Sequence, residues 1–209
     1  MILLGAGGHA KVLLSLIKAA GYDVLGVCAP ELREEGVDTW RGIPVLDTDD
    51  NLTAFDPERV AVVNGVGDQR VRQKLYEQLK VLGYYFPPLI HPRAYVDPTV
   101  KLDEGVQVMA GAVIQSDTHV GQNVIINTQA SVDHDCIIED HVHLGPGAVL
   151  CGHVLVKKGA FIGSGASVVI GIQIGEYAIM GAGVSIVRNI EPGRIVLPAS
   201  VRVTSKGET

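Results

Sequence analysis

The densest group of side chains able to do chemistry lies at residues 133–143, which read DHDCIIEDHVH. Three histidines, three aspartates and one glutamate fall within eleven positions. These residue types serve metal sites, acid/base catalysis and solvated turns. The choice among the three depends on the scaffold that carries the stretch.

The scaffold around this stretch is a six-residue repeat. From Ala94 to Asn189 the chain divides without a gap into 16 blocks of six. The third position of every block is aliphatic or Met, the first is small or β-branched, and turn-forming residues gather at positions four to six. A period of six excludes an α-helix and predicts a strand and turn repeated as a β-solenoid, with the third position pointing inward.

Residues 1–90 follow a different pattern. Strands are expected within MILLGAG, DVLGVC, RVAVVNGVG and YYFPPLI. A helix is expected after the first strand and another after Asp68, a predicted N-cap, with ends at Gly21 and Gly83. The expected apolar faces of these helices are Val12, Leu13, Leu16, Ile17 and Ala20, and Val71, Leu75, Leu79 and Leu82. This pattern predicts a small β-α-β domain with a parallel sheet over 1–90, joined near Pro87-Pro88 and His91-Pro92 to a solenoid domain over 91–209.

The turn GAGGHA at residues 5–10 fits the glycine pattern of dinucleotide sites. The second strand, however, ends in Cys28-Ala29-Pro30 without the carboxylate that holds a ribose, and the domain is short for two nucleotide-binding halves. The turn therefore predicts a cradle of backbone amides for one pyrophosphate at the start of a helix. A tight turn without a ligand is the alternative.

Composition excludes several classes of function. The net charge is −6 with no lysine/arginine block, so neither nucleic acid nor an anionic membrane is an expected partner. No apolar run approaches the ~20 residues of a membrane span. We expect no signal peptide, because no basic leader precedes the short apolar run at the start. Three cysteines without a CxxC pair indicate a reducing cytoplasm.

Several segments together resemble a known family. They are GAGGHAK at the start, VGDQRVRQKL at 66–75, LIHP at 89–92 and INTQASVDHDCIIEDHVHLGPGA at 126–148, besides the 16 hexapeptides. The chain resembles hexapeptide-repeat sugar acetyltransferases of the bacillosamine/perosamine N-acetyltransferase and sialic acid O-acetyltransferase type. The resemblance implies a left-handed parallel β-helix of about five coils, a homotrimer, acetyl-CoA between neighbouring β-helices, and a nucleotide-sugar in the small domain.

The repeat also places the histidines. His134 is at position five of its block, in an outward turn, and His143 is at an outward position two faces further on. The two should therefore not share a metal. No two histidines are 18 residues apart, the spacing of successive coils; His134 and His153 come nearest, at 19. We expect no metal site, and we expect solvated turn residues at His119, His141 and His153.

The resemblance implies roles for particular residues. His134 is the expected general base, with Asp135 raising its basicity if so short a side chain reaches the ring. His143 is expected to donate to the thioester carbonyl from a neighbouring subunit. The implied acetyl-CoA contacts also include backbone amides at Gly152, Ser164 and Ala182. The implied substrate contacts are Gly7, Gly8, His9 and Gly67 for the nucleotide-sugar and Asn127 for the sugar.

Two positions depart from the family pattern. Cys28-Ala29-Pro30 stands where an Asp-Asp pair is common, and Ser200 stands where a basic residue is common. The expected function is acetyl-CoA-dependent N-acetylation of a nucleotide-linked amino sugar, most simply a 4-amino-4,6-dideoxyhexose, without a metal. O-acetylation of a sugar such as sialic acid and a non-catalytic nucleotide-sugar-binding scaffold are the alternatives.

Overall fold

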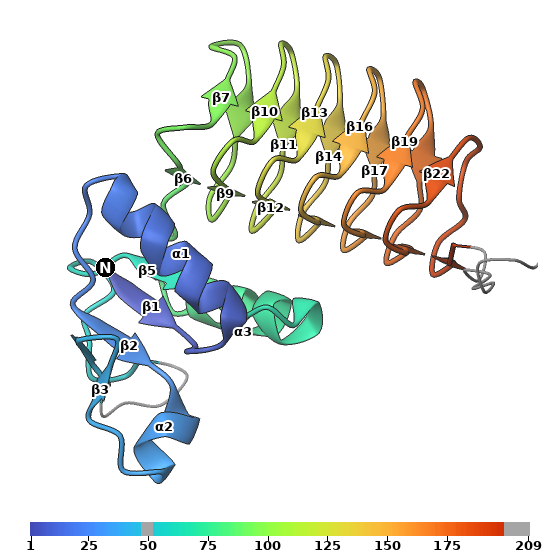
Figure 1. Cartoon of the computed structure of the whole chain (residues 1–209). Helices are drawn as coiled ribbons and strands as arrows, with labels where there is room; N and C mark the ends of the chain where they lie inside the picture. The colour runs from blue at the N-terminus through green and yellow to red at the C-terminus, as the bar shows by residue number, and fades with distance from the viewer. Residues whose placement is uncertain (47–51, 199–209) are drawn as a thin grey trace, which may run out of the picture.

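The computed structural model describes residues 1–46 and 52–198, which form a small α/β domain and a long parallel β-solenoid (Figure 1). The small domain contains a three-stranded parallel sheet in the order β2-β1-β5. Its elements are β1 (Ile2–Leu4), α1 (Gly8–Ala19), β2 (Gly26–Cys28), α2 (Pro30–Glu34), β3 (Thr39–Trp40), β4 (Ile43–Pro44), β5 (Val62–Asn64) and α3 (Gln69–Val81). The predicted parallel sheet is confirmed. Ser200 lies outside the described residues.

The ends of α3 form as expected. The carboxylate of Asp68 accepts hydrogen bonds from the N–H groups of Arg70 and Val71, which is the predicted N-cap. Gly83 follows the helix with φ at +91°. The prediction of its apolar face was partly wrong, because Val71 and Leu82 are each 46% exposed. Val71 lines an open cavity at the carboxyl ends of the strands rather than the core.

The predicted apolar face of α1 was also partly wrong, at Val12 and at Ala20, which is half-buried and follows the helix as its C-cap. Leu13, Leu16 and Ile17 are buried as predicted, whereas Val12 is exposed and Leu14 is buried in its place. The helix packs between its own sheet and the solenoid, so its buried stripe is turned toward both. The sequence pattern predicts one apolar face, packed on the sheet, and it does not include the solenoid as a second packing partner.

Up to residue 198, where the described part ends, the solenoid contains 18 two-residue strands that form three parallel sheets. The six-stranded face is β7 (Tyr95–Val96), β10 (Val113–Ile114), β13 (Ser131–Val132), β16 (Val149–Leu150), β19 (Ser167–Val168) and β22 (Ser185–Ile186). The five-stranded face is β8 (Lys101–Leu102), β11 (His119–Val120), β14 (Ile137–Ile138), β17 (Leu155–Val156) and β20 (Gln173–Ile174). The seven-stranded face is β6 (Leu89–Ile90), β9 (Gln107–Val108), β12 (Ile125–Ile126), β15 (His143–Leu144), β18 (Phe161–Ile162), β21 (Ile179–Met180) and β23 (Ile195–Val196).

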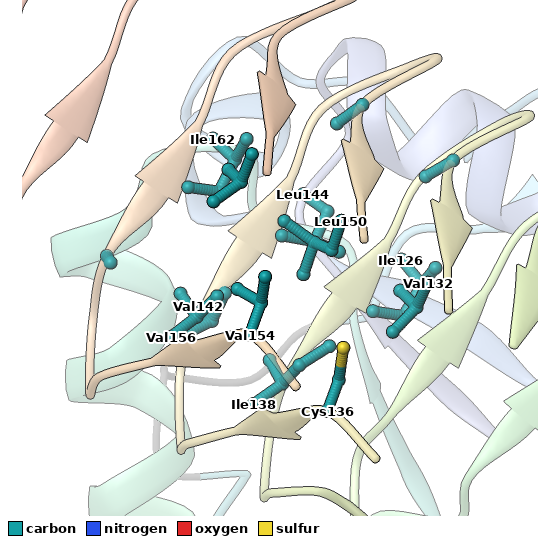
Figure 2. Packing of buried hydrophobic residues seen from close by; sticks show 14 of the residues in the cluster. Ile126, Val132, Cys136, Ile138, Val142, Leu144, Leu150, Val154, Val156 and Ile162 are labelled. Carbon is teal, nitrogen blue, oxygen red and sulfur yellow. The ribbon is translucent and has the colours of Figure 1, made fainter. Parts of the chain in front are cut away.

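The six-residue pattern is confirmed in register. A strand occupies positions two and three of every predicted block, and strands 18 residues apart pair, as Ile114 does with Val132. The third and most first positions fill the interior, where Ile138, Leu144 and Val154 point toward one another (Figure 2). The predicted five coils become about six, because β6 and β23 extend the two ends.

The small domain packs against the seven-stranded face. One apolar cluster joins Leu13 of α1 with Met109 and Ile125 of the solenoid. The expected last strand over 84–90 divides between the two units: Tyr85 bridges to Ala61 of the small domain, whereas β6 belongs to the solenoid. One apolar cluster therefore continues across the junction, separate from the interior of the solenoid.

Polar side chains of α3 also anchor the junction. The guanidinium of Arg72 is fully buried and donates to the backbone carbonyls of Asn123 and His141. The side chain of Gln69 donates to the carbonyl of Gly159 at 2.6 Å. Because these acceptors are turns of the solenoid, α3 is held in one register along it. No helix within the described residues is long and apolar enough to cross a membrane.

Candidate active site

His134 lies in the turn between β13 and β14, at the corner between the six-stranded and five-stranded faces. Its Nδ1 is 2.7 Å from Oδ2 of Asp135, so the short aspartate does reach the ring. This hydrogen bond raises the pKa of His134 above its ordinary value. Asp135 has φ at +58°, a left-handed turn conformation, and its side chain meets the ring of the residue just before it.

Gly152 lies under the His134 ring, one coil further along the chain. A Cβ at this position would come within 2.6 Å of the imidazole, so a larger residue would displace the ring. His153 follows directly, and its ring meets that of His134 edge-on with centroids 5.2 Å apart. Gly152 is the residue one full coil, or 18 positions, after His134, and it has no side chain. His153, 19 positions after His134, can therefore reach the His134 ring.

Asp135 faces both rings, since its Oδ2 is also 3.6 Å from Nε2 of His153. Ligand atoms of His134, Asp135 and His153 lie within 4.8 Å of one another. The group is exposed and offers three ligands, one fewer than a closed structural zinc site. The expectation that no metal is needed stays a prediction, and its test is activity in the presence of a chelator.

His143 has the opposite environment. His143 lies on β15, where Ile125 and Phe161 are its partners on the two neighbouring strands. Its side chain points outward from the solenoid, as expected, and the small domain covers it there. Burial, and then the positive charge of Arg72, lower the pKa of His143 to about 3, so the ring is neutral. Its Nε2 is 3.1 Å from Nδ2 of Asn127. The imidazole of His9, in the small domain, has its ring centroid 6.3 Å from that of His143.

The expectation of a solvated turn was wrong for His141. The residue is only 3% exposed, because α3 covers the turn that carries it. Its Nδ1 is 2.9 Å from Nδ2 of Asn123, and burial lowers its pKa to about 4. His119, on the open five-stranded face, is exposed as expected and contacts Asp103 at 3.1 Å.

His134 and His143 lie on opposite sides of one solenoid. The corner that carries His134 joins the six-stranded and five-stranded faces, whereas His143 is on the seven-stranded face. In a three-sided coil the corner between two faces is the one opposite the third face. One chain therefore does not bring the two histidines to one substrate atom.

The residues predicted to contact acetyl-CoA through their backbone amides also lie at two different corners of the solenoid. Gly152 is at the corner of His134, whereas Ser164 and Ala182 follow β18 and β21 at the corner between the seven-stranded and six-stranded faces. Within the described part of the chain, the N–H groups of these three residues donate to no backbone carbonyl. They are available to acceptors on a ligand.

The predicted contacts in the small domain lie at the carboxyl ends of the parallel strands. Gly7 is the N-cap of α1 and Gly8 its first residue, while Gly67 follows β5 and lies beside His9. A cavity of about 340 Å³ opens next to them. Its lining is Leu4, Gly5, Cys28, Pro30, Glu31, Val66, Val71 and Leu75.

Sequence reasoning missed Glu31. The carboxylate expected at the end of the second strand is absent, but α2 places Glu31 at the cavity three residues later. The one available signal was an acidic residue in the first turn after Pro30.

Family models match both units. Residues 1–79 match the model described as PglD N-terminal domain, and residues 117–152 match that of the bacterial transferase hexapeptide of six repeats. PerB from Caulobacter crescentus, solved with CoA and GDP-perosamine, is 37% identical with a TM-score of 0.87 over 94% of this chain and 93% of that one. The chain belongs to the perosamine and bacillosamine N-acetyltransferase family.

Other members agree with this assignment. The acetyltransferase domain of PglB from Neisseria gonorrhoeae FA1090, solved with acetyl coenzyme A, is 36% identical with a TM-score of 0.87 over 94% of this chain and 95% of that one. The two solved members thus hold CoA or its acetyl thioester. The resemblance read from the sequence motifs is confirmed.

Curated members match over shorter segments. GDP-perosamine N-acetyltransferase from Escherichia coli O157:H7 is 28% identical over 46% of this chain and 43% of its own length. UDP-N-acetylbacillosamine N-acetyltransferase from Bacillus subtilis (strain 168) is 38% identical over 52% of this chain and 50% of its own length. The chain matches half or less of the length of these two relatives.

Proposed function

We propose that the protein transfers the acetyl group of acetyl-CoA to the amine of a nucleotide-linked amino sugar, most simply a 4-amino-4,6-dideoxyhexose. The hydrogen bond between His134 and Asp135 is the observation that carries the proposal. The names of the relatives, which include GDP-perosamine and UDP-N-acetylbacillosamine N-acetyltransferases, support the substrate class. The three cysteines form no CxxC pair, which is compatible with a reaction in the cytoplasm.

His134 is suited to act as the general base. Because its Nδ1 proton is held by Asp135, the lone pair is on Nε2. Nε2 takes a proton from the sugar amine as the nitrogen attacks the thioester carbonyl. The C–N bond forms, the C–S bond breaks, and the proton passes from His134 to the leaving thiolate. Asp135 stabilises the intermediate imidazolium.

The other proposed contacts come from a neighbouring copy of the chain. His143, Ser164 and Ala182 lie on or beside the seven-stranded face, away from the corner of His134. In a homotrimer, the corner of one chain meets that face of the next, and acetyl-CoA lies between them. The nucleotide would occupy the cavity at the strand ends, with its pyrophosphate at the amides of Gly7 and Gly8.

A thiol-release assay tests the proposed reaction. Acetyl-CoA is combined in turn with GDP-linked and UDP-linked 4-amino sugars and with sialic acid, and the product is identified by mass spectrometry and NMR. We expect thiol release with an amino sugar and a new acetamide, in the presence or absence of a chelator. Acetylation of a hydroxyl would replace this proposal with O-acetylation. Nucleotide-sugar binding without thiol release would indicate a scaffold.

A complementation assay tests the shared site. Inactive His134→Ala and His143→Ala chains are co-refolded, and mixed trimers are isolated by two affinity tags. Some interfaces in such trimers pair two intact histidines, so part of the activity should return. Verified mixed trimers without recovered activity, or a fully active monomer by light scattering, would contradict the shared site.

A further inference from the structure

The junction between the small domain and the solenoid contains two histidines whose tautomers can be worked out from their neighbours. An amide side chain contacts one ring nitrogen of each: Asn127 contacts His143, and Gln107 contacts His9. The orientation of each amide is set by a second contact, to the backbone. A backbone N–H can only donate and a carbonyl can only accept, so these contacts identify which end of each amide faces its histidine.

At His143 the amide donates. The N–H of Thr128 donates to Oδ1 of Asn127 at 2.8 Å, which leaves Nδ2 toward the imidazole. Nδ2 carries only hydrogens, so Nε2 of His143, 3.1 Å away, must be the acceptor. The single proton of the neutral ring is then on Nδ1. The strong lowering of the pKa of His143 by burial agrees with a neutral ring.

At His9 the amide accepts. Nε2 of Gln107 donates to the carbonyl of Asn64 at 2.8 Å, which leaves Oε1 toward the imidazole. Nε2 of His9, 2.8 Å from Oε1, must therefore carry the proton, and the lone pair is on Nδ1. Burial lowers the pKa of His9 as well, which again favours the neutral form.

We propose that Asn127 is a positioning residue that holds His143 in its Nδ1–H tautomer, and that Gln107 holds His9 in the opposite one. The junction then presents one hydrogen-bond donor on His143 and one acceptor on His9. Neither Nδ1 contacts an acceptor or donor among the described residues, so both are available to a ligand.

This arrangement deepens the proposed function and rests on it for the identity of the ligands. The Nδ1–H of His143 suits a carbonyl oxygen such as that of the thioester. A lone pair on His9 cannot bind a diphosphate, whose oxygens only accept, and it suits a sugar hydroxyl or amine. Asn127, expected to touch the sugar, thus acts through His143.

The tautomers can be measured directly. Long-range ¹H–¹⁵N correlation spectra of the ¹⁵N-histidine-labelled protein near pH 7.5 distinguish protonated from unprotonated ring nitrogens. We expect protonated Nδ1 in His143 and protonated Nε2 in His9. The opposite tautomer at His143 overturns the proposal, and this spectrum of the unchanged protein needs neither activity nor a variant that folds.

The same amide-to-acid substitution should have opposite consequences at the two positions. In Asn127→Asp the carboxylate still accepts from Thr128 but now also accepts from His143, which moves the proton to Nε2 and removes the donor. In Gln107→Glu the carboxylate still accepts from Nε2–H of His9, so that tautomer is retained. An unchanged His143 spectrum in folded Asn127→Asp would overturn the positioning role.

Kinetics connect the tautomer to the reaction. Loss of the His143 donor in Asn127→Asp should lower kcat about 10²-fold, as for other oxyanion donors, with little change in KM for the nucleotide-sugar. Gln173→Glu is also an amide-to-acid substitution, at an exposed position on the five-stranded face, and it should retain wild-type kcat. Unchanged kcat in Asn127→Asp with a switched tautomer would overturn the thioester contact. A wild-type protein that transfers no acetyl group would contradict the proposed function, while the spectra still decide the tautomers.

Discussion

The exposed corner at His134 and the covered junction at His141 and His143 use the same scaffold in opposite ways. Both carry histidines in or beside turns of one solenoid. At the corner, a carboxylate is the nearest partner and the pKa of His134 is raised. At the junction, burial and the charge of Arg72 lower the pKa of His141 and His143 to about 4 and about 3. Histidine is thus suited to act as a base at the corner and as a neutral hydrogen-bonding group at the junction.

The sharpest test of the corner is His134→Asn. Removal of a general base should lower kcat by about 10²–10⁴-fold. The free energy of unfolding should change little, because the side chain is outside the apolar interior. Steady-state kinetics and urea unfolding measure the two quantities. His119→Asn, at an exposed histidine paired with Asp103, is the matched control and should be active. Near-normal turnover of folded His134→Asn would remove His134 from the mechanism.

Arg72→Ala tests what holds the junction. The substitution leaves the carbonyls of Asn123 and His141 without this donor and opens a space in the core. We expect the free energy of unfolding to fall by about 2–4 kcal/mol. Gln73→Ala, at the half-buried neighbour on α3, should change it by at most about 0.5 kcal/mol. Equal urea midpoints for the two variants would mean that apolar contacts alone hold the domains together.

Acid should weaken the junction through His141. Its pKa is lowered to about 4 in the folded protein, against about 6.5 when unfolded, so the unfolded chain binds the extra proton between these values. The contribution to stability is full above pH ~6.5 and decreases as the pH falls toward 4. Between pH 7 and pH 5, wild type should lose about 2 kcal/mol more than His141→Gln in urea titrations. Parallel losses in the two proteins would show that His141 can take up a proton without unfolding.

The smallest expected effect is a shift of the pH profile at the corner. The base works when neutral, and its hydrogen bond to Asp135 raises the pKa of His134, so kcat/KM should fall as the pH drops through a value above 6.5. In Asp135→Asn the midpoint of this acid limb should move to lower pH. Asp103→Asn, which removes the carboxylate facing His119, should leave the midpoint in place. An unmoved limb in Asp135→Asn would show that another group titrates there.

The sequence by itself determined the solenoid and the corner. A six-residue repeat places one aliphatic side chain inward in every block, and any shift of register would expose that whole ladder, so Val132 and Ile138 could be placed without coordinates. The outward turn of His134 follows from the same count. The Asp68 cap and the parallel strands of the small domain are also local patterns, and they form as predicted.

Only the tertiary structure decided what covers the outward positions. His119 and His141 are expected from the sequence to be solvated and His143 to point outward, but the first meets water while α3 and α1 of the small domain cover the other two. Coverage depends on contacts between residues as distant as Arg72 and His141, which no local period encodes. The approach of His153 to His134 likewise required the stacked coils, because it depends on the space that Gly152 leaves between them.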